Sequence, residues 1–239
     1  VIIIPTRLEA RRFPNKPLAK INNKPMIIHV LNKAKESKVG EVFVATPDQK
    51  IFDIVKDNGG IAILTQNSHL SGSDRVYEVY SKKLKNNVDL IINLQGDMPN
   101  IDPNTISKLE KLMRINQCDI GTLASPIKNN NEIVDENVVK VQVDKKLKDH
   151  SFLQAKDFFR KKKDLNNDKV YHHLGLYIFT KDALTRYVKL KRSKLEIERN
   201  LEQMRAMENN MIVKVGVTHS MPLSVDTEED LKKVEKEIN

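Results

Sequence analysis

Cysteine, tryptophan and long apolar runs are scarce or missing in this sequence of 239 residues, which has one cysteine and no tryptophan. Because Cys118 has no second cysteine to pair with, an internal disulfide is excluded and a reducing, cytoplasmic location is favoured. No apolar run reaches the roughly 18 residues that a bilayer span requires, so membrane insertion is not expected. The apolar N-terminal stretch leads at once into charged residues, so we expect no signal peptide.

Aromatic residues are also few, at 5% of the chain, whereas the formal net charge is +9. The excess of positive charge favours anionic partners in general. The basic residues are spread along the chain, without the aromatic stacking platform, zinc-ligand spacing or helix-turn-helix pattern of nucleic-acid binders. We therefore expect no nucleic-acid partner, and the hydrophobic content of 39% is ordinary for a soluble globular protein.

The first half of the chain alternates short apolar runs with amphipathic helical patterns. The expected strands are 1–4, 41–45, 61–64 and 88–94, and the expected helices are 25–38, 48–58, 73–85 and 102–115. Pro25 suits the first turn of its helix, and glycines follow residue 58 where the second helix should end. This order predicts an α/β fold with a mostly parallel sheet and right-handed crossovers.

The pattern changes in the second half. The expected strands are 119–124, 138–143, 170–179 and 211–217, and the expected helices are 195–209 and 227–238. The first two of these strands are expected to follow one another without a helix between them. Residues 145–169 are charged and poorly periodic, which is typical of an insertion that is mobile or lies at an interface.

Two aspartates follow apolar stretches and are candidate metal ligands. Asp97 ends the segment Asn-Leu-Gln-Gly-Asp after an expected strand, and Asp226 follows Leu-Ser-Val far along the chain. In an open α/β sheet, ligands collect at the carboxyl ends of the strands. Mg²⁺ is usually held by one or two carboxylates together with substrate phosphates. The alternative for Asp226 is a helix cap, because the sequence Asp-Thr-Glu-Glu-Asp begins a helix.

A basic segment, residues 5–18, follows the first expected strand. Arg7, Arg12 and Lys16 in this loop would neutralise a triphosphate and stabilise charge that develops on it. The segment is neither a Walker A loop nor the G-x-G-x-x-G pattern of a dinucleotide site. An exposed basic loop without a ligand is the alternative interpretation.

A further candidate is residues 69–75, which read His-Leu-Ser-Gly-Ser-Asp-Arg. Ser71 and Ser73 can hydrogen-bond a ligand or cap a helix, and Gly72 allows a close approach of the backbone. The alternative is an ordinary N-cap sequence.

Polar residues also gather around a strand and a helix of the second half. His173 and Tyr177 share one face of the expected strand by its period of two. With Glu202 and Gln203 they could form a polar pocket for a polyhydroxylated substrate. The alternative is a histidine and a tyrosine that are satisfied within the core.

Taken in this order, these segments resemble the 3-deoxy-manno-octulosonate cytidylyltransferase (CMP-Kdo synthetase) family. The matching segments are 5–18 to P-A/S/T-R-x-x-S/A-x-R-L/F-x-x-K-P-L, 44–46 to V-A-T, 69–75 to H-x-S-G-T/S-D-R, 95–99 to Q-G-D-x-P, 173–177 to H-L/V-G-x-Y, 201–205 to L-E-Q-L/M-R and 225–231 to V-D-T-x-E-D-L. Each motif is modest by itself, but seven in the right order are specific.

The resemblance implies a cytoplasmic, magnesium-dependent nucleotidyltransferase that joins CTP and 3-deoxy-manno-octulosonate (Kdo) into CMP-Kdo and pyrophosphate for lipopolysaccharide biosynthesis. It implies a Rossmann-like nucleotidyltransferase fold over residues 1–239 as a single domain, with a dimerisation insertion at 125–170 and a homodimer as the assembly. The partners would be CTP and an ulosonic acid.

The resemblance also implies a role for each matching residue. Arg7, Lys16 and Asp97 would be catalytic. The CTP side would be bound by Arg7, Arg12, Lys16, Ser71, Gly72, Ser73 and Arg75, the sugar acid by Gln95, His173, Tyr177, Glu202 and Gln203, and Mg²⁺ by Asp97 and Asp226.

The chain departs from the family pattern at three places. Pro47 separates Val-Ala-Thr from Asp48, and Met98 stands where many relatives have glutamate. Residues 148–156 lack the arginine of the family's F-S-R-x-x-I-P segment, for which Lys156 or Arg160 could substitute. Two alternatives therefore stay open: a cytidylyltransferase for another ulosonic acid, such as an amino-Kdo or a nonulosonic acid, and a non-catalytic nucleotide-binding paralogue.

Overall fold

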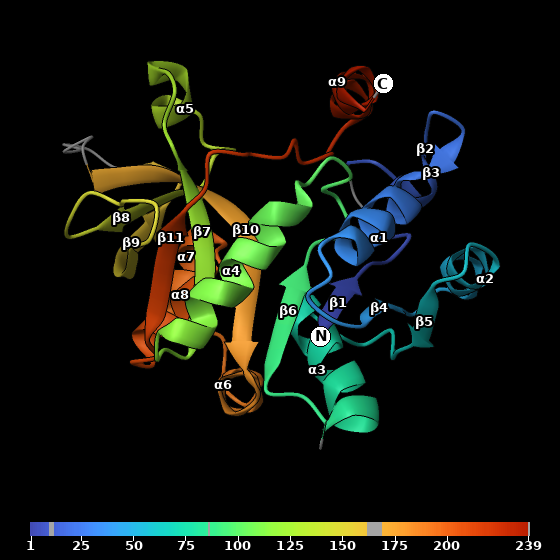
Figure 1. Cartoon of the computed structure of the whole chain (residues 1–239), viewed down its shortest axis with the longest axis horizontal. Coiled ribbons are helices and arrows are strands. Elements are labelled where there is room, and N and C mark those ends of the chain that lie inside the picture. The colour runs from blue at the N-terminus through green and yellow to red at the C-terminus, as the bar shows by residue number, and fades with distance from the viewer. Residues whose placement is uncertain (10–11, 86, 162–168, 239) are drawn as a thin grey trace. The chain divides into compact units, whose positions relative to one another are not determined.

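The computed structural model describes residues 1–9, 12–85, 87–161 and 169–238 (Figure 1). The chain forms two compact units. The first comprises residues 1–107 and 222–239, and the second comprises residues 108–221. Helix α4 (Pro103–Ile115) runs across the boundary in sequence. No helix of the described part of the chain is both long enough and apolar enough to span a bilayer.

The first unit contains a parallel sheet with the strand order β5-β4-β1-β6. Its strands are β1 (Ile2–Pro5), β4 (Val42–Thr46), β5 (Ile61–Leu64) and β6 (Leu90–Leu94). Consecutive residues of β1 and β4 are buried, so both faces of these strands are covered, as continuous apolar runs in a parallel sheet predict. The parallel order expected from the sequence is confirmed here.

Helices follow the strands of the first unit as expected. They are α1 (Met26–Glu36), α2 (Gln49–Asp57), α3 (Gly72–Val79), which continues into the π-helical turn η2 (Tyr80–Leu84), and α9 (Glu228–Glu237). A short 3-10 helix, η1 (Lys16–Leu18), precedes a small hairpin of β2 (Lys20–Ile21) and β3 (Lys24–Pro25). The sequence suggested that Pro25 lies in the first turn of α1. In the structure it is instead the extended residue just before that helix.

A small apolar cluster joins the C-terminal segment to the N-terminal part of the first unit. Ile21, Met26, Val225 and Val234 are fully buried together in it. This cluster, which we call the C-terminal clasp, fixes α9 and the chain just before it against β2 and the start of α1.

The second unit contains five strands in the order β10-β7-β11-β9-β8, and β8 also pairs with the start of β10. The strands are β7 (Ile120–Pro126), β8 (Lys140–Val143), β9 (Phe152–Phe159), β10 (Val170–Thr180) and β11 (Val213–Val217). The pair of β11 with β7 is parallel, and the other pairs within this unit are antiparallel. The predicted α/β class is confirmed, with the parallel order concentrated in the first unit.

Several expectations for the second unit are wrong. The eight-residue strand β9 was not expected, and the short helix α5 (Asn130–Val134) lies between β7 and β8, where no helix was expected. The interpretation of 145–169 as an insertion at an interface stays a prediction, and its residues 162–168 lie outside the described residues. The helix expected over 195–209 is two helices, α7 (Lys194–Arg199) and α8 (Gln203–Glu208), because Asn200 adopts the left-handed conformation with a φ of 52°. Helix α6 (Lys181–Tyr187) was not expected from the sequence.

The predicted dimerisation insertion at 125–170 includes α5, β8 and β9, and these two strands belong to the sheet of the second unit. Its role in a homodimer, and the description of residues 1–239 as one domain, stay predictions.

Candidate functional site

The two candidate metal ligands lie together in the first unit. Lys16 Nζ lies 3.1 Å from Asp97 Oδ2 and 3.3 Å from Asp226 Oδ1. Arg12 Nη2 lies 2.9 Å from the other oxygen of Asp226. The expected convergence of two distant aspartates with the basic loop is therefore present in the structure.

Backbone contacts hold the two aspartates in register. Asp97 is the third residue after the end of β6, and its carbonyl oxygen accepts a hydrogen bond of 2.9 Å from the N–H of Val225. Val225 belongs to the C-terminal clasp, so burial of an apolar side chain places the neighbouring Asp226. Gly96 permits a close approach on the other side, because a Cβ there would lie 3.2 Å from Thr6 Cβ.

The helix-cap alternative for Asp226 is wrong by one residue. Thr227 is the N-cap of α9, and its side chain and that of Asp230 form a capping box. The Asp226 N–H donates to Asp230, while the Asp226 carboxylate contacts Lys16 and Arg12. The Asp226 oxygens are thus available to a ligand and are not required by the helix.

This acidic pair fits a hard divalent cation. Carboxylate oxygens are the donors that Mg²⁺ prefers, and one or two are enough when phosphates complete the coordination. Among the described residues, no group of three or more histidine, cysteine, aspartate or glutamate side chains could hold a metal ion without such help. The donor set therefore suits a metal that arrives with a phosphate ligand.

Asp48 positions the start of the basic loop, a role that the sequence did not reveal. Its Oδ2 accepts a hydrogen bond of 2.8 Å from the Leu8 N–H. Asp48 is also the N-terminal flanking residue of α2, and its own N–H donates to Thr46 Oγ1. Arg7 lies in the same loop, about half exposed and 3.7 Å from Glu9, so its guanidinium is held only by a surface contact.

The segment 69–75 forms the start of α3, as its alternative interpretation stated. Ser71 is the N-cap and forms a capping box with Asp74. Ser73 is buried and accepts from Asn93, whose amide oxygen in turn accepts from Gln95. These bonds link Gln95 to the base of α3, and nucleotide binding by Ser71 and Ser73 stays a prediction.

Gly72 stands at a crowded point of the same segment. A Cβ at Gly72 would lie 3.3 Å from Pro5 Cγ and 3.6 Å from Gln95 Nε2. The start of α3 is thereby brought next to the ends of β1 and β6. Gly72 thus lines the same edge of the sheet as Asp97.

Arg75 and Glu78 turn inward and hold the loop between β5 and α3. Arg75 is 3% exposed and donates to Thr65 Oγ1 and to the carbonyl oxygen of Gln66. Glu78 accepts from the Gln66 N–H at 2.9 Å, and it contacts His69 at 2.5 Å and Lys82 at 2.6 Å. The predicted contact of Arg75 with nucleotide stays untested, but its observed contacts position a loop.

In the second unit, His173 and Tyr177 lie side by side on β10, with ring centroids 5.4 Å apart. Burial lowers the pKa of His173 to about 3, so its imidazole is neutral at pH 7. Burial, followed by the nearby Glu202, raises the pKa of Tyr177 well above its ordinary value, which keeps the phenol protonated. Both rings therefore offer neutral hydrogen-bonding groups.

Glu202 lies in the turn between α7 and α8, and Gln203 is the first residue of α8. The turn is fixed by the buried pair of Glu196 and Arg205, which are joined by two hydrogen bonds of 2.6 and 2.8 Å. Arg205 also lies over the ring of Tyr187, and the Tyr187 hydroxyl donates to the carbonyl oxygen of Glu202. The arginine of the L-E-Q-M-R motif is thus a structural residue that the sequence interpretation left without a role.

The two possible substitutes for the missing arginine are engaged elsewhere. Lys156 forms an exposed ion pair of 2.9 Å with Asp144. Arg160 donates to the carbonyl oxygens of Glu136 and Asn137. Met98, which replaces the usual glutamate, is 5% exposed and contributes to the core.

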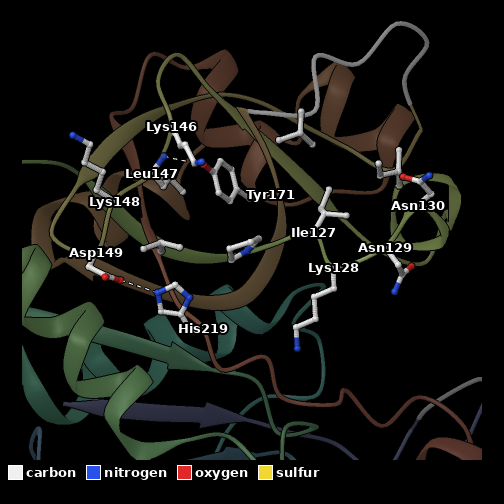
Figure 2. Close-up of a pocket in the computed structure, with 14 residues that line it drawn as sticks. Ile127, Lys128, Asn129, Asn130, Lys146, Leu147, Lys148, Asp149, Tyr171 and His219 are labelled. Carbon is white, nitrogen blue, oxygen red and sulfur yellow. Dashed lines mark hydrogen bonds and ion pairs between the residues drawn. The ribbon is translucent and has the colours of Figure 1, made fainter.

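The second unit also contains a pocket of about 540 Å³ near the ends of β7 and β11 (Figure 2). The Tyr171 hydroxyl accepts from the Leu147 N–H in its wall, and Asp149 pairs with His219 at 2.8 Å at its rim. Its lining does not include the predicted substrate residues. Most of the lining comes from the segment 125–170.

A parallel sheet with an acidic pair and a cationic loop at the carboxyl ends of its strands is suited to a metal-bound nucleoside triphosphate. The sequence matches the cytidylyltransferase family over residues 1–215, and the chain belongs to that family. The resemblance seen in the motifs is thereby confirmed.

Curated relatives and solved structures agree with this membership. The 3-deoxy-manno-octulosonate cytidylyltransferase of Brucella canis is 42% identical over 230 residues, covering 96% of this chain and 91% of the relative. A solved structure of CMP:2-keto-3-deoxy-manno-octonic acid synthetase complexed with CTP has a TM-score of 0.89 at 34% identity, covering 100% of this chain and 97% of that one. A cytidylyltransferase from Leptospira borgpetersenii, with a TM-score of 0.61 at 20% identity over 98% of this chain and 84% of its own, shares the fold.

We predict that the contribution of Glu78 to stability depends on pH. Burial alone would raise its pKa, but hydrogen bonds from Lys82, His69 and the Gln66 N–H lower it from 4.5 to about 2. The ionised form therefore stabilises the folded state fully above pH 4.5, and this contribution is lost as the pH falls towards 2. Glu78→Gln should lower the free energy of unfolding more at pH 7 than at pH 3, as measured by urea denaturation.

The matched control is Glu198→Gln, which changes an exposed glutamate on α7. It should show little difference from the original protein at either pH. An equal loss of stability for Glu78→Gln at both pH values would contradict the assignment.

Proposed function

We propose that the chain is a cytidylyltransferase that joins CTP and Kdo to give CMP-Kdo and pyrophosphate. The main support is structural: Asp97 and Asp226 both contact Lys16. The chain is also 42% identical, over 96% of its length, to a relative named for that reaction. The solved structure with 34% identity is described as complexed with CTP, which supports CTP as the nucleotide.

In the proposed reaction, the anomeric hydroxyl of the sugar acid attacks the α-phosphorus of CTP. A new oxygen–phosphorus bond forms, the bond to the pyrophosphate group breaks, and the hydroxyl proton passes to solvent. Arg7 and Lys16 would stabilise the charge of the departing pyrophosphate. Arg12 would add positive charge on the same side, because its guanidinium already lies beside Asp226.

We further propose that Asp97 and Asp226 hold Mg²⁺. Bound there, the cation would lower the pKa of the attacking hydroxyl and neutralise phosphate charge. Lys16 Nζ now lies between the two carboxylates, within 3.3 Å of an oxygen of each. Because one ammonium and one divalent cation cannot both occupy that position, cation binding would release Lys16 toward the phosphates.

The second unit would supply the sugar-acid contacts. His173, Tyr177 and Gln203 are neutral groups that can donate or accept hydrogen bonds, which suits a substrate with several hydroxyls. We propose these three side chains, with Glu202, as the sugar-acid contacts of the second unit. For Gln95 of the first unit, whose amide donates to Asn93, contact with the sugar acid is a separate proposal.

A second candidate substrate is another ulosonic acid. It is favoured by the absence of arginine from residues 148–156 and by the contacts of Lys156 and Arg160 with other partners. Lysine also lacks the bidentate geometry with which arginine binds a carboxylate. The carboxylate of the sugar acid would then be bound differently from that of the family's usual substrate.

The proposal includes a homodimer built through residues 125–170 and a cytoplasmic location. An exposed Val134, at 71%, and the hollow lined by this segment support a contact surface there. Cys118 is the single cysteine of the sequence and cannot form an internal disulfide, which suits a reducing compartment. Light scattering from the purified chain measures the assembly.

A pyrophosphate-release assay tests the proposed reaction. CTP, Mg²⁺ and Kdo should release pyrophosphate, and ATP, GTP or UTP should replace CTP poorly. Release with an amino-Kdo or a nonulosonic acid in place of Kdo would favour the second candidate. Binding of CTP without turnover on any of these acids would show a non-catalytic paralogue instead.

We predict that Asp97→Asn lowers kcat more than about a hundredfold, because the metal contributes several kcal/mol of transition-state stabilisation. The fold should remain, as judged by circular dichroism. Asp53→Asn, a change of an exposed aspartate on α2, serves as the control and should leave kcat unchanged. A kcat for Asp97→Asn within threefold of the original would refute the metal role.

We also predict that Lys16→Met increases affinity for Mg²⁺ in the absence of nucleotide. Removal of the ammonium leaves two carboxylates without their shared partner, so the thermal midpoint in EDTA should fall and should recover when Mg²⁺ is added. Calorimetric titration with Mg²⁺ and thermal melts measure the two effects. Lys33→Met, which removes an exposed partner of Glu36, is the control.

If Lys16→Met melts at the same temperature with and without Mg²⁺, the exchange between lysine and cation is wrong. That outcome would leave the cytidylyltransferase assignment standing, because pyrophosphate release by the original protein is measured separately.

A further inference from the structure

Strand β10 is interrupted beside the proposed sugar-acid residues. Leu174 pairs with Leu123 of β7, and the next paired residue, Tyr177, stands opposite Thr122. Gly175 and Leu176 therefore form a bulge that has no partners on β7. A bulge of this kind redirects the side chains that flank it, here His173 and Tyr177.

The hydroxyl of Thr122 lies at the centre of the bulge. Thr122 is fully buried, and its Oγ1 lies 2.8 Å from the Leu176 carbonyl oxygen, 3.1 Å from the Leu174 carbonyl oxygen and 3.0 Å from His173 Nε2. A threonine hydroxyl has one proton to donate and lone pairs to accept. The two carbonyl oxygens can only accept, so this proton is directed to them.

It follows that His173 Nε2 donates to Thr122 Oγ1. A neutral imidazole has one N–H and one unprotonated nitrogen, so Nδ1 must be the acceptor when Nε2 is the donor. The neutral state agrees with the burial of the ring, which is packed edge-on to Phe158 at 5.0 Å. The number of donors and acceptors around the Thr122 hydroxyl thus selects the Nε2–H tautomer of His173.

The Nδ1 edge of His173 is open to a ligand. Within the described part of the chain, Nδ1 has no hydrogen-bond partner, and no buried side-chain nitrogen or oxygen is left unsatisfied. The 7% of His173 that remains exposed therefore includes Nδ1. An unprotonated nitrogen at this edge attracts a donor and repels a carboxylate.

We propose that Thr122 is a positioning residue that holds His173 in the Nε2–H form, so that Nδ1 accepts a hydrogen bond from a substrate hydroxyl. The substrate part of this inference rests on the proposed function. It assigns His173 to a hydroxyl of the sugar acid and excludes it as a ligand of the carboxylate. Thr122 also fixes the bulge, and with it the offset between His173 and Tyr177.

Nuclear magnetic resonance of ¹⁵N-histidine-labelled protein tests the tautomer directly. In a long-range ¹H–¹⁵N correlation at pH 7, His173 should show the pattern of a neutral Nε2–H ring, and His173→Gln identifies its signals by their loss. Thr122→Ser should keep this pattern. Thr122→Val, which has the same shape without the hydroxyl, should lose it. An Nδ1–H or doubly protonated His173 in the original protein would overturn the proposal.

Steady-state kinetics provide the functional readout. Thr122→Val should raise KM for the sugar acid about tenfold, the loss expected for one oriented hydrogen bond, and leave KM for CTP unchanged. Thr122→Ser should restore the original KM. The control is Thr185→Val, which removes an exposed hydroxyl on α6 that bonds only the carbonyl oxygen of Lys181. Equal behaviour of the serine and valine variants would contradict the proposal.

The two readouts separate this inference from the proposed function. If the chain releases no pyrophosphate with any acid, the tautomer of His173 and its dependence on Thr122 can still be measured. If the tautomer is as proposed but Thr122→Val leaves KM for the sugar acid unchanged, the hydroxyl contact at Nδ1 is wrong.

Discussion

Two ionised carboxylates repel each other at close range unless positive charge lies beside them, and the candidate site depends on this constraint. The Val225 N–H bond to Asp97 and the buried clasp around Val225 hold the two aspartates close together. The ammonium of Lys16 neutralises negative charge on both aspartates, and the guanidinium of Arg12 neutralises charge on Asp226. The position of the basic loop therefore follows from the charge that the C-terminal segment brings to the end of β6.

The parts of the fold that the sequence predicted well are those determined by local pattern. The bounds predicted for β5 from its apolar run are those observed. The predicted bounds of β1 and β4 each lie one residue before the observed ones. The rule that ligands gather at the carboxyl ends of parallel strands applies to Asp97, which follows β6. Asp226 follows an irregular segment, so its approach to Asp97 depends on tertiary contacts, the Val225 N–H bond and the C-terminal clasp.

The errors arose where tertiary contacts override the local pattern. Strand β9 carries lysine and aspartate among its apolar residues because one face meets solvent, so it showed no clear period. The helix expected over 195–209 breaks at Asn200, and the buried Glu196–Arg205 pair stabilises the two shorter helices that result. The cap of α9 was predicted one residue early, and that single residue decides whether Asp226 serves a helix or a ligand.

The motifs therefore contain residues of two physical kinds. Arg75 and Arg205 are buried, and their guanidinium groups contact carbonyl, hydroxyl or carboxylate oxygens of the same unit. Their removal would leave buried polar groups unpaired, so both serve the fold. Lys16 and Asp97 are partly exposed and contact each other, and in the proposed function they exchange this contact for a ligand. A motif match cannot separate the two kinds, because both appear as letters at the right spacing. Burial and hydrogen-bond stoichiometry do separate them, and they are also the grounds on which we propose that Thr122, which lies outside the matching motifs, orients His173.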